Sequence, residues 1–107
     1  MPHYLFQVAY DEGGLQALVQ SPQDRIALVT PAVQKAGGRV EVAYFSFGEY
    51  DVMLVAEMPD NVAAAGLALA FGAGGSLKAV KTTPLLTAAE SVEAMKKASQ
   101  TGYKAAK

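Results

Sequence analysis

The stretch "RVEVAYFSFGEYDVMLVAEM", residues 39–58, decides the fold of this chain. It contains two runs rich in β-branched and aromatic residues, 39–47 and 50–58, with only Gly48 and Glu49 between them. Such runs are typical of strands, and a two-residue connection with Gly first is typical of a type II′ hairpin turn. The stretch therefore predicts two antiparallel strands joined by a tight turn.

A turn at Gly48 and Glu49 also predicts which residues lie opposite one another. One face would carry the pairs Phe47–Tyr50, Phe45–Val52, Ala43–Leu54 and Glu41–Ala56. The other face would carry Ser46–Asp51, Tyr44–Met53, Val42–Val55 and Val40–Glu57. Both faces are mostly apolar, and a sheet of this kind needs a cover on each side.

Upstream of the hairpin, the sequence predicts a strand and a helix. "HYLFQVAY", residues 3–10, is a strand-like run that ends at the turn-forming "DEGG". "SPQD" predicts a helix start, with Ser21 as N-cap and Pro22 at the first helical position. We expect this helix to end at Gly37 and Gly38, and to kink or break at Pro31, which has no N–H to donate.

Downstream, the same order of elements returns. Asp60 is a predicted N-cap for a helix that ends at the glycines of residues 72–75. Residues 76–86 follow as a strand, with Pro84 typical of a sheet edge. Thr87 and Glu90 form a capping-box pattern, which predicts a terminal helix before a frayed tail at 99–107.

The order βαββαβ predicts an α+β, ferredoxin-like fold: a four-stranded antiparallel sheet with two helices on one face, plus an extra C-terminal helix. Residues 1–107 make one domain, with a core at 3–92. Because two helices cover only one apolar face, we expect a second copy of the sheet to cover the other. The expected assembly is a homo-oligomer, a dimer or a multiple of dimers.

Composition narrows the function classes. Nine basic and ten acidic residues are scattered along the chain, and the net charge is −1, which argues against nucleic acid and membrane surfaces as partners. The absence of Cys excludes disulfides and a cysteine nucleophile, and favours a cytoplasmic location. The longest apolar stretch, residues 62–73, is too short to span a bilayer, and the N-terminus lacks the pattern of a secretory signal.

Four segments together resemble the GYD domain family. They are "GEYDVMLVAEMPD" at 48–60, with the Gly-x-Tyr-Asp core at Gly48, Tyr50 and Asp51, and also "SPQDR", "KAGGRV" and "ALALAFGAGGSLKAVKTTPLL". The similarity covers roughly residues 3–92. It implies a dimeric α+β barrel, in which small ferredoxin-like subunits pair sheet to sheet. The uninterrupted first helix implied by the resemblance differs from this chain at Pro31.

The resemblance implies no assigned activity for the family itself. Relatives in the wider superfamily include cofactor-independent monooxygenases, lactone isomerases and haem proteins, and this kinship is an analogy of fold. Two hypotheses follow. The first is a homo-oligomeric module of unassigned function that binds a small apolar ligand and needs no cofactor. The alternative is a cofactor-independent enzyme, monooxygenase-like or isomerase-like, acting on a small, partly aromatic molecule.

The catalytic candidates are Asp51, as general base, and Tyr50, as phenolic donor. The structural interpretation is that Tyr50 packs beside Phe47 while Asp51 caps loop amides or pairs with Ser46. Both interpretations remain open, although adjacent strand residues point to opposite faces, which separates Tyr50 from Asp51.

The ligand-binding candidates are Tyr44, Ser46 and Met53, which share a face with Asp51 and would line a mainly apolar cavity or a dimer interface. His3 is the only imidazole in the chain. A lone His supports no multi-His metal site within one copy. The alternatives for His3 are that it ligates haem alone or meets its mate across a two-fold axis; we expect no metal and treat His3 as a strand-end residue near the surface.

Overall fold

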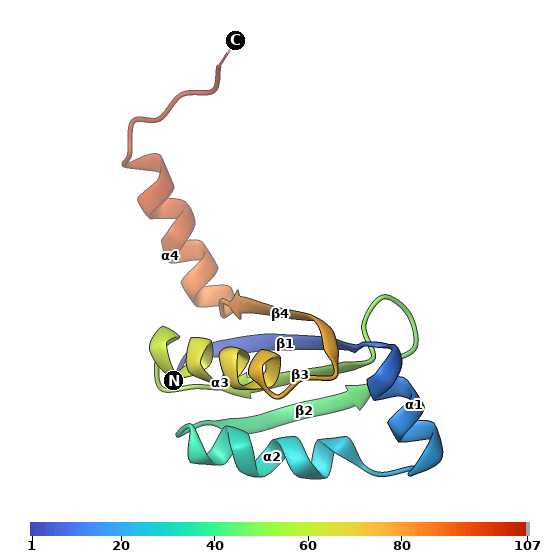
Figure 1. Ribbon diagram of the computed structural model, residues 1–107. Coiled ribbons are helices and arrows are strands. Elements are labelled where there is room, and N and C mark those ends of the chain that lie inside the picture. Colours follow the sequence, from blue (N-terminus) through green and yellow to red (C-terminus); the bar gives the residue numbers. More distant parts are fainter. Residues whose placement is uncertain (107) are drawn as a thin grey trace.

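The computed structural model describes residues 1–106 as four strands and four helices (Figure 1). In chain order these are β1 (His3–Tyr10), α1 (Glu12–Gln20), α2 (Arg25–Lys35), β2 (Arg39–Phe45), β3 (Val52–Glu57), α3 (Asn61–Ala73), β4 (Leu77–Leu85) and α4 (Ala88–Ser99). The predicted α+β fold is confirmed, with α1 as an additional short helix.

The strands form one antiparallel sheet in the order β2-β3-β1-β4. This is the order expected of a ferredoxin-like βαββαβ unit, in which the two halves interleave and β1 and β3 become the central strands. β4 is an edge strand, so Pro84, which has no N–H for a ladder, lies where sheets tolerate proline. The edge position predicted from Pro84 is therefore confirmed.

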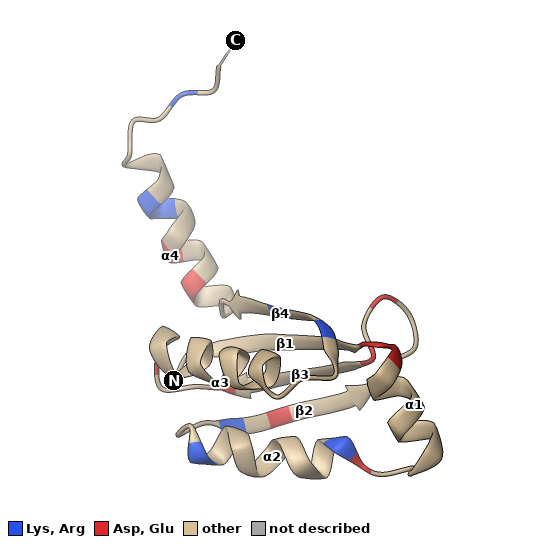
Figure 2. Ribbon diagram, viewed as in Figure 1, with Lys and Arg blue, Asp and Glu red and all other residues tan. Residues whose placement is uncertain are grey.

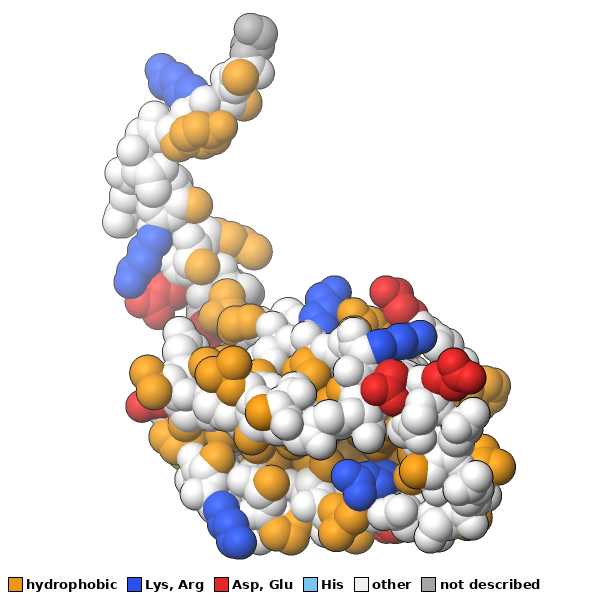
Figure 3. All heavy atoms as spheres, viewed as in Figure 1, with side chains coloured by type: hydrophobic (Ala, Val, Ile, Leu, Met, Phe, Trp, Pro, Cys, Tyr) orange, Lys and Arg blue, Asp and Glu red, His pale blue; other side chains and the backbone are white. Residues whose placement is uncertain are grey.

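The core lies between the sheet and helices α2 and α3. Phe6, Leu54 and Met58 are fully buried from the sheet side, and Val33 is fully buried from α2. The ring of Phe6 meets that of Phe71 from α3 edge to face, with centroids 6.1 Å apart. Figure 3 shows hydrophobic side chains gathered between the two helices on this face of the molecule.

Two predicted boundaries near the first helix are wrong. "DEGG" is a helix start and not a turn, because the Asp11 carboxylate accepts a hydrogen bond from Gly14 N at 2.8 Å and caps α1. Ser21 ends α1, and Asp24 is the N-cap of α2. Helix α2 is continuous through Pro31, so the predicted break does not occur. The left-handed stop is confirmed at Gly37, whose φ is +88°.

The predicted two-residue hairpin turn is also wrong. β2 ends at Phe45 and β3 begins at Val52, so residues 46–51 form a longer loop. A type II′ turn needs a positive φ at Gly48, whereas the glycines with positive φ among residues 1–106 are Gly37, Gly75 and Gly102.

The predicted register is confirmed for only part of the β2–β3 ladder. The pairs from Val42–Val55 to Phe45–Val52 are as expected. A bulge at Glu41 then shifts the ladder by one residue, so that Val40 lies opposite Ala56 and Arg39 opposite Glu57. The predicted pairs Glu41–Ala56 and Val40–Glu57 are therefore wrong.

Helix α4 extends away from the rest of the chain, past the β4 edge of the sheet (Figure 1). Its predicted capping box is confirmed, with reciprocal hydrogen bonds between Thr87 and Glu90. None of residues 88–99 is buried, and Val92 and Met95 remain exposed. Within residues 1–106, each helix falls short of the length and apolar character that crossing a bilayer requires.

Candidate functional site

The sheet face turned away from α2 and α3, here called the open face, carries three rows of side chains. The ladder pairings place one residue of each strand in every row. The middle row is Val42, Val55, Leu5 and Thr83; the hairpin row is Tyr44, Met53, Gln7 and Lys81; the bulge row is Arg39, Glu57, His3 and Leu85. The open face thus has an apolar middle and two polar ends.

At the hairpin end, the open face borders a shallow hollow of about 390 Å³. Its lining combines the loop with two side chains of the hairpin row: Gln7, Ser46, Phe47, Gly48, Glu49, Tyr50 and Lys81. Gln7 and Lys81 are neighbours across the β1–β4 ladder, and both line the hollow. The hollow is shallow and mostly polar, and it differs in this respect from the mainly apolar cavity expected from the sequence.

Asp51 holds the loop against β1. Its carboxylate accepts a hydrogen bond from the backbone N–H of Tyr10 at 2.9 Å, and its own N–H donates to the carbonyl of Val8 at 2.8 Å. Its carbonyl accepts from Ser46 N, which closes the base of the loop. The side chain therefore satisfies a backbone donor of the mostly buried Tyr10, which belongs to β1 and is neither a loop amide nor Ser46, the partners expected from the sequence.

The loop also settles the positions of its neighbours. The Ser46 hydroxyl donates to the carbonyl of Tyr50 at 2.6 Å, so both residues belong to the lining of the same hollow. The predicted packing of Phe47 against Tyr50 is wrong, because Phe47 is fully exposed. Strand alternation fails here since residues 46–51 are not in a strand.

Of the residues predicted to form a site, Tyr44, Met53, Ser46 and Tyr50 lie at the hairpin end of the open face. Asp51 stands apart from the hollow's lining with its carboxylate on the Tyr10 amide.

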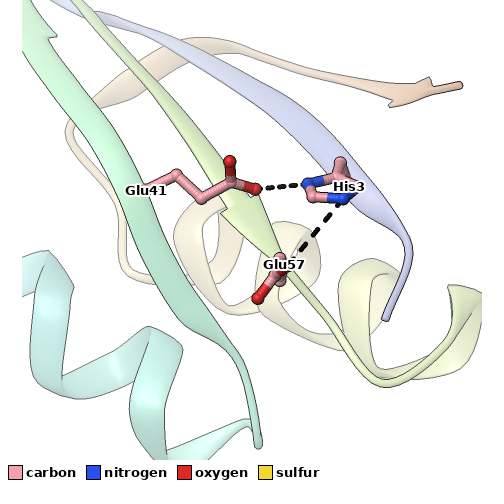
Figure 4. Close-up of side chains that lie close together, drawn as sticks. All are labelled: His3, Glu41 and Glu57. Carbon is pink, nitrogen blue, oxygen red and sulfur yellow. Dashed lines mark hydrogen bonds and ion pairs between the residues drawn. The ribbon is translucent and has the colours of Figure 1, made fainter. Parts of the chain in front are cut away.

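The bulge end holds a charged cluster that sequence reasoning missed (Figure 4). The His3 ring lies between two carboxylates: Nδ1 bonds Glu41 Oε1, and Nε2 is 3.8 Å from Glu57 Oε1. The Arg39 guanidinium donates two hydrogen bonds to Glu57 Oε2, from Nε at 3.1 Å and Nη2 at 2.7 Å. These bonds lower the pKa of Glu57, because they stabilise the ionised carboxylate.

The bulge explains why this cluster could not be predicted. A regular ladder would place Glu41 and Glu57 on opposite faces of the sheet, whereas the extra residue turns Glu41 toward His3. One signal was available: charged residues interrupt otherwise apolar strands at Glu41 and Glu57. Figure 2 shows that charged residues lie on the sheet: β2 begins with both a basic and an acidic residue, whereas α3 carries no charge.

A second, more enclosed cavity of about 240 Å³ lies on the helix side of the sheet. Apolar side chains of the sheet and of α2 and α3 line it, including Val52, Val29 and Phe71, with Arg25 as its charged group. This cavity borders the core, and its lining includes none of the residues that the sequence proposed for catalysis or ligand binding.

Comparison with known proteins supports the fold and leaves the activity open. The GYD domain family model matches residues 4–95. Two solved structures share the fold. "Crystal structure of FFRP-DM1" has 14% identity and a TM-score of 0.51, with 80% of this chain and 100% of that chain covered. A hypothetical protein, PHS023 from Pyrococcus horikoshii, has 13% identity and a TM-score of 0.52, with 81% and 92% covered. A comparison with curated protein sequences gave no significant match.

Proposed function

We propose that two copies of this chain, which belongs to the GYD domain family, pair through their open faces. They bind a small, mainly apolar molecule between the two sheets. The middle row carries this proposal. Val42, Val55 and Leu5 form an apolar strip across three strands, on the face that α2 and α3 leave uncovered. Beside them Tyr44 is 62% exposed, so the apolar surface continues toward the hairpin.

The area of the open face supports an interface that includes more than the sheet. Four strands spaced about 4.8 Å apart, each with about seven residues of 3.3 Å, make a face of roughly 15 by 23 Å. This is about 350 Å² of projected area; its accessible area is larger because the side chains give it relief, and a standard interface buries roughly 800 Å² of accessible area on each partner. We expect further surface to join the sheet in a stable dimer.

Helix α4 supplies such a surface. It is 12 residues long, and an isolated helix of this length is marginal in water. Met95 is 67% exposed and Val92 is 49% exposed, whereas Glu93 and Lys97 form an ion pair on its polar side. Because α4 extends past the sheet edge, a second copy is the occupant that suits its apolar side (Figure 1).

The ligand chemistry follows from the hairpin row. Met53 and the middle row offer apolar contacts to the ligand. Gln7 and Lys81 offer hydrogen-bond donors to one oxygen-bearing group at an end of the ligand. Binding is favoured over catalysis because the carboxylate of Asp51 already accepts the Tyr10 amide. We therefore expect a small apolar molecule with a single polar or acidic group.

Assembly is tested by light scattering coupled to size exclusion. We expect the wild type to run as a dimer or a multiple of dimers, and Val42→Lys to shift it toward monomer, because a charge in the apolar strip cannot be desolvated without cost. Val62→Lys is the matched control: Val62 is 80% exposed on α3, so its variant should assemble as the wild type does. A folded wild type that is monomeric at micromolar concentrations would refute the pairing.

Ligand binding is tested by native mass spectrometry on freshly purified protein. We expect extra mass on the wild type that Met53→Trp removes by filling the space beside the hollow. Ala70→Leu is the control, since Ala70 lines the helix-side cavity. Loss of the extra mass in Ala70→Leu alone would assign the ligand to that cavity, and absence of extra mass would contradict a carried ligand.

A further inference from the structure

We propose that His3, Glu41 and Glu57 form a binding site for a divalent transition-metal ion, with Zn²⁺ as its representative. One imidazole nitrogen and one oxygen from each carboxylate lie within 4.8 Å of one another. The three side chains come from the adjacent strands β1, β2 and β3, and Figure 4 shows them converging on one place on the open face. All three ligands belong to a single chain, so the site does not depend on the proposed dimer.

The sheet positions these side chains. His3 and Glu57 are direct neighbours across the β1–β3 ladder, where paired residues lie about 5 Å apart. Glu41 joins them through the bulge, since the extra residue in β2 has no partner in β3 and its side chain is free to turn toward His3. Bulges often re-aim a side chain beside a functional site, and here the re-aimed side chain is a carboxylate.

The donor set selects the class of ion. Imidazole nitrogen with carboxylate oxygen suits Zn²⁺ and its first-row neighbours, whereas Mg²⁺ and Ca²⁺ prefer oxygen alone. Zn²⁺ bonds of about 2.0–2.2 Å place tetrahedral ligand atoms roughly 3.4 Å apart. The side chains of His3, Glu41 and Glu57 are 28%, 32% and 20% exposed, so small rotations can close the remaining distance.

Arg39 has a positioning role. Its guanidinium occupies Oε2 of Glu57 and leaves Oε1 directed at His3, which fixes the oxygen available to a metal ion. Bonds of this kind from outside the ligand set orient ligands and are common in metal sites. Three protein ligands leave a fourth position for water or for a ligand atom.

His3 makes the test direct, because it is the sole imidazole in the chain. In tag-free protein, Zn²⁺ titration should shift the imidazole resonances of His3 in nitrogen-15 NMR, with one ion bound per chain in parallel calorimetry. Mg²⁺ should leave these resonances unchanged. Zn²⁺ binding that leaves the His3 resonances unmoved, or no binding up to millimolar Zn²⁺, would overturn the site.

Variants complete the test. His3→Gln, Glu41→Gln and Glu57→Gln should each weaken Zn²⁺ binding by at least about tenfold, since even outer-shell losses commonly cost that much. Glu12→Gln, at an exposed position in the first turn of α1, is the matched control and should keep wild-type affinity. Glu57→Gln also removes the partner of Arg39, so His3→Gln and Glu41→Gln decide the matter. Unchanged affinity in these two variants would show an ordinary hydrogen-bonded cluster.

Discussion

The two ends of the open face differ in how they reveal themselves. At the hairpin end, three polar residues that are adjacent in the sequence, Glu49, Tyr50 and Asp51, suggest a functional site. In the structure, however, Asp51 mainly holds the loop against β1. At the bulge end, His3, Glu41 and Glu57 are far apart in the chain, so no sequence motif joins them. The structure nevertheless brings His3 within reach of both carboxylates. The adjacent residues of the hairpin loop therefore have a structural role, whereas the proposed metal ligands come from three different strands.

The largest expected effect tests the structural role of the hairpin end. Asp51→Ala should lower the free energy of unfolding by about 1–3 kcal/mol, because it leaves the buried amide of Tyr10 without its acceptor. Asp51→Asn keeps an acceptor oxygen and should lose less. Urea denaturation measures both, with Glu49→Ala as a control expected to stay within about 0.5 kcal/mol of the wild type. Wild-type stability in Asp51→Ala would return Asp51 to the catalytic candidates.

Deletion of the bulge residue should have a smaller effect on stability, and it tests whether the bulge is needed for folding or only for metal binding. Deleting Glu41 would join Val40, already opposite Ala56, to Val42, already opposite Val55, and so restore a regular ladder. We expect unfolding free energy within about 1 kcal/mol of the wild type together with loss of Zn²⁺ binding. Calorimetry and denaturation on the same sample measure the two results. A deletion that unfolds the chain would show that the bulge is needed for the sheet itself.

The smallest expected effect is the loss, at acidic pH, of the stability that the Arg39–Glu57 ion pair contributes. Arg39 holds the pKa of Glu57 below its ordinary value of 4.5, so the stabilisation from this pair is fully present above that value and is lost as pH falls through the lower, folded-state pKa. Wild type should therefore exceed Glu57→Gln in urea midpoint at pH 7, with the difference shrinking below about pH 4.5. A difference that stays constant down to pH 3 would show that the ion pair contributes nothing.

Local rules predicted most of the elements but misplaced several boundaries. "SPQD" offers Ser21 and Asp24 as N-caps within four residues, and propensity alone does not choose between them. "DEGG" looks like a turn, but Gly14 is needed for close packing: a Cβ there would lie 2.6 Å from the carbonyl of Ser76. The reason for this glycine is a contact with a residue 62 positions away in the chain, which no local pattern contains.

The candidate site was predicted in outline only. Tyr44 and Met53 were placed on one face correctly because strand alternation is a local property. The cluster at His3 was missed because a single bulge reverses the face of every residue beyond it, and the sequence "RVEVAY" carries no mark of a bulge.

The sequence by itself determined the βαββαβ order, the helix caps at Asp60 and Thr87, and the apolar character of both sheet faces, since each depends on residues close together in the chain. Tertiary structure alone decided where β2 changes register and which carboxylates meet His3. These depend on pairings across strands, whose energies are set by distant partners. A shift of one residue in such a pairing changes little locally and moves a charged side chain from one face of the sheet to the other.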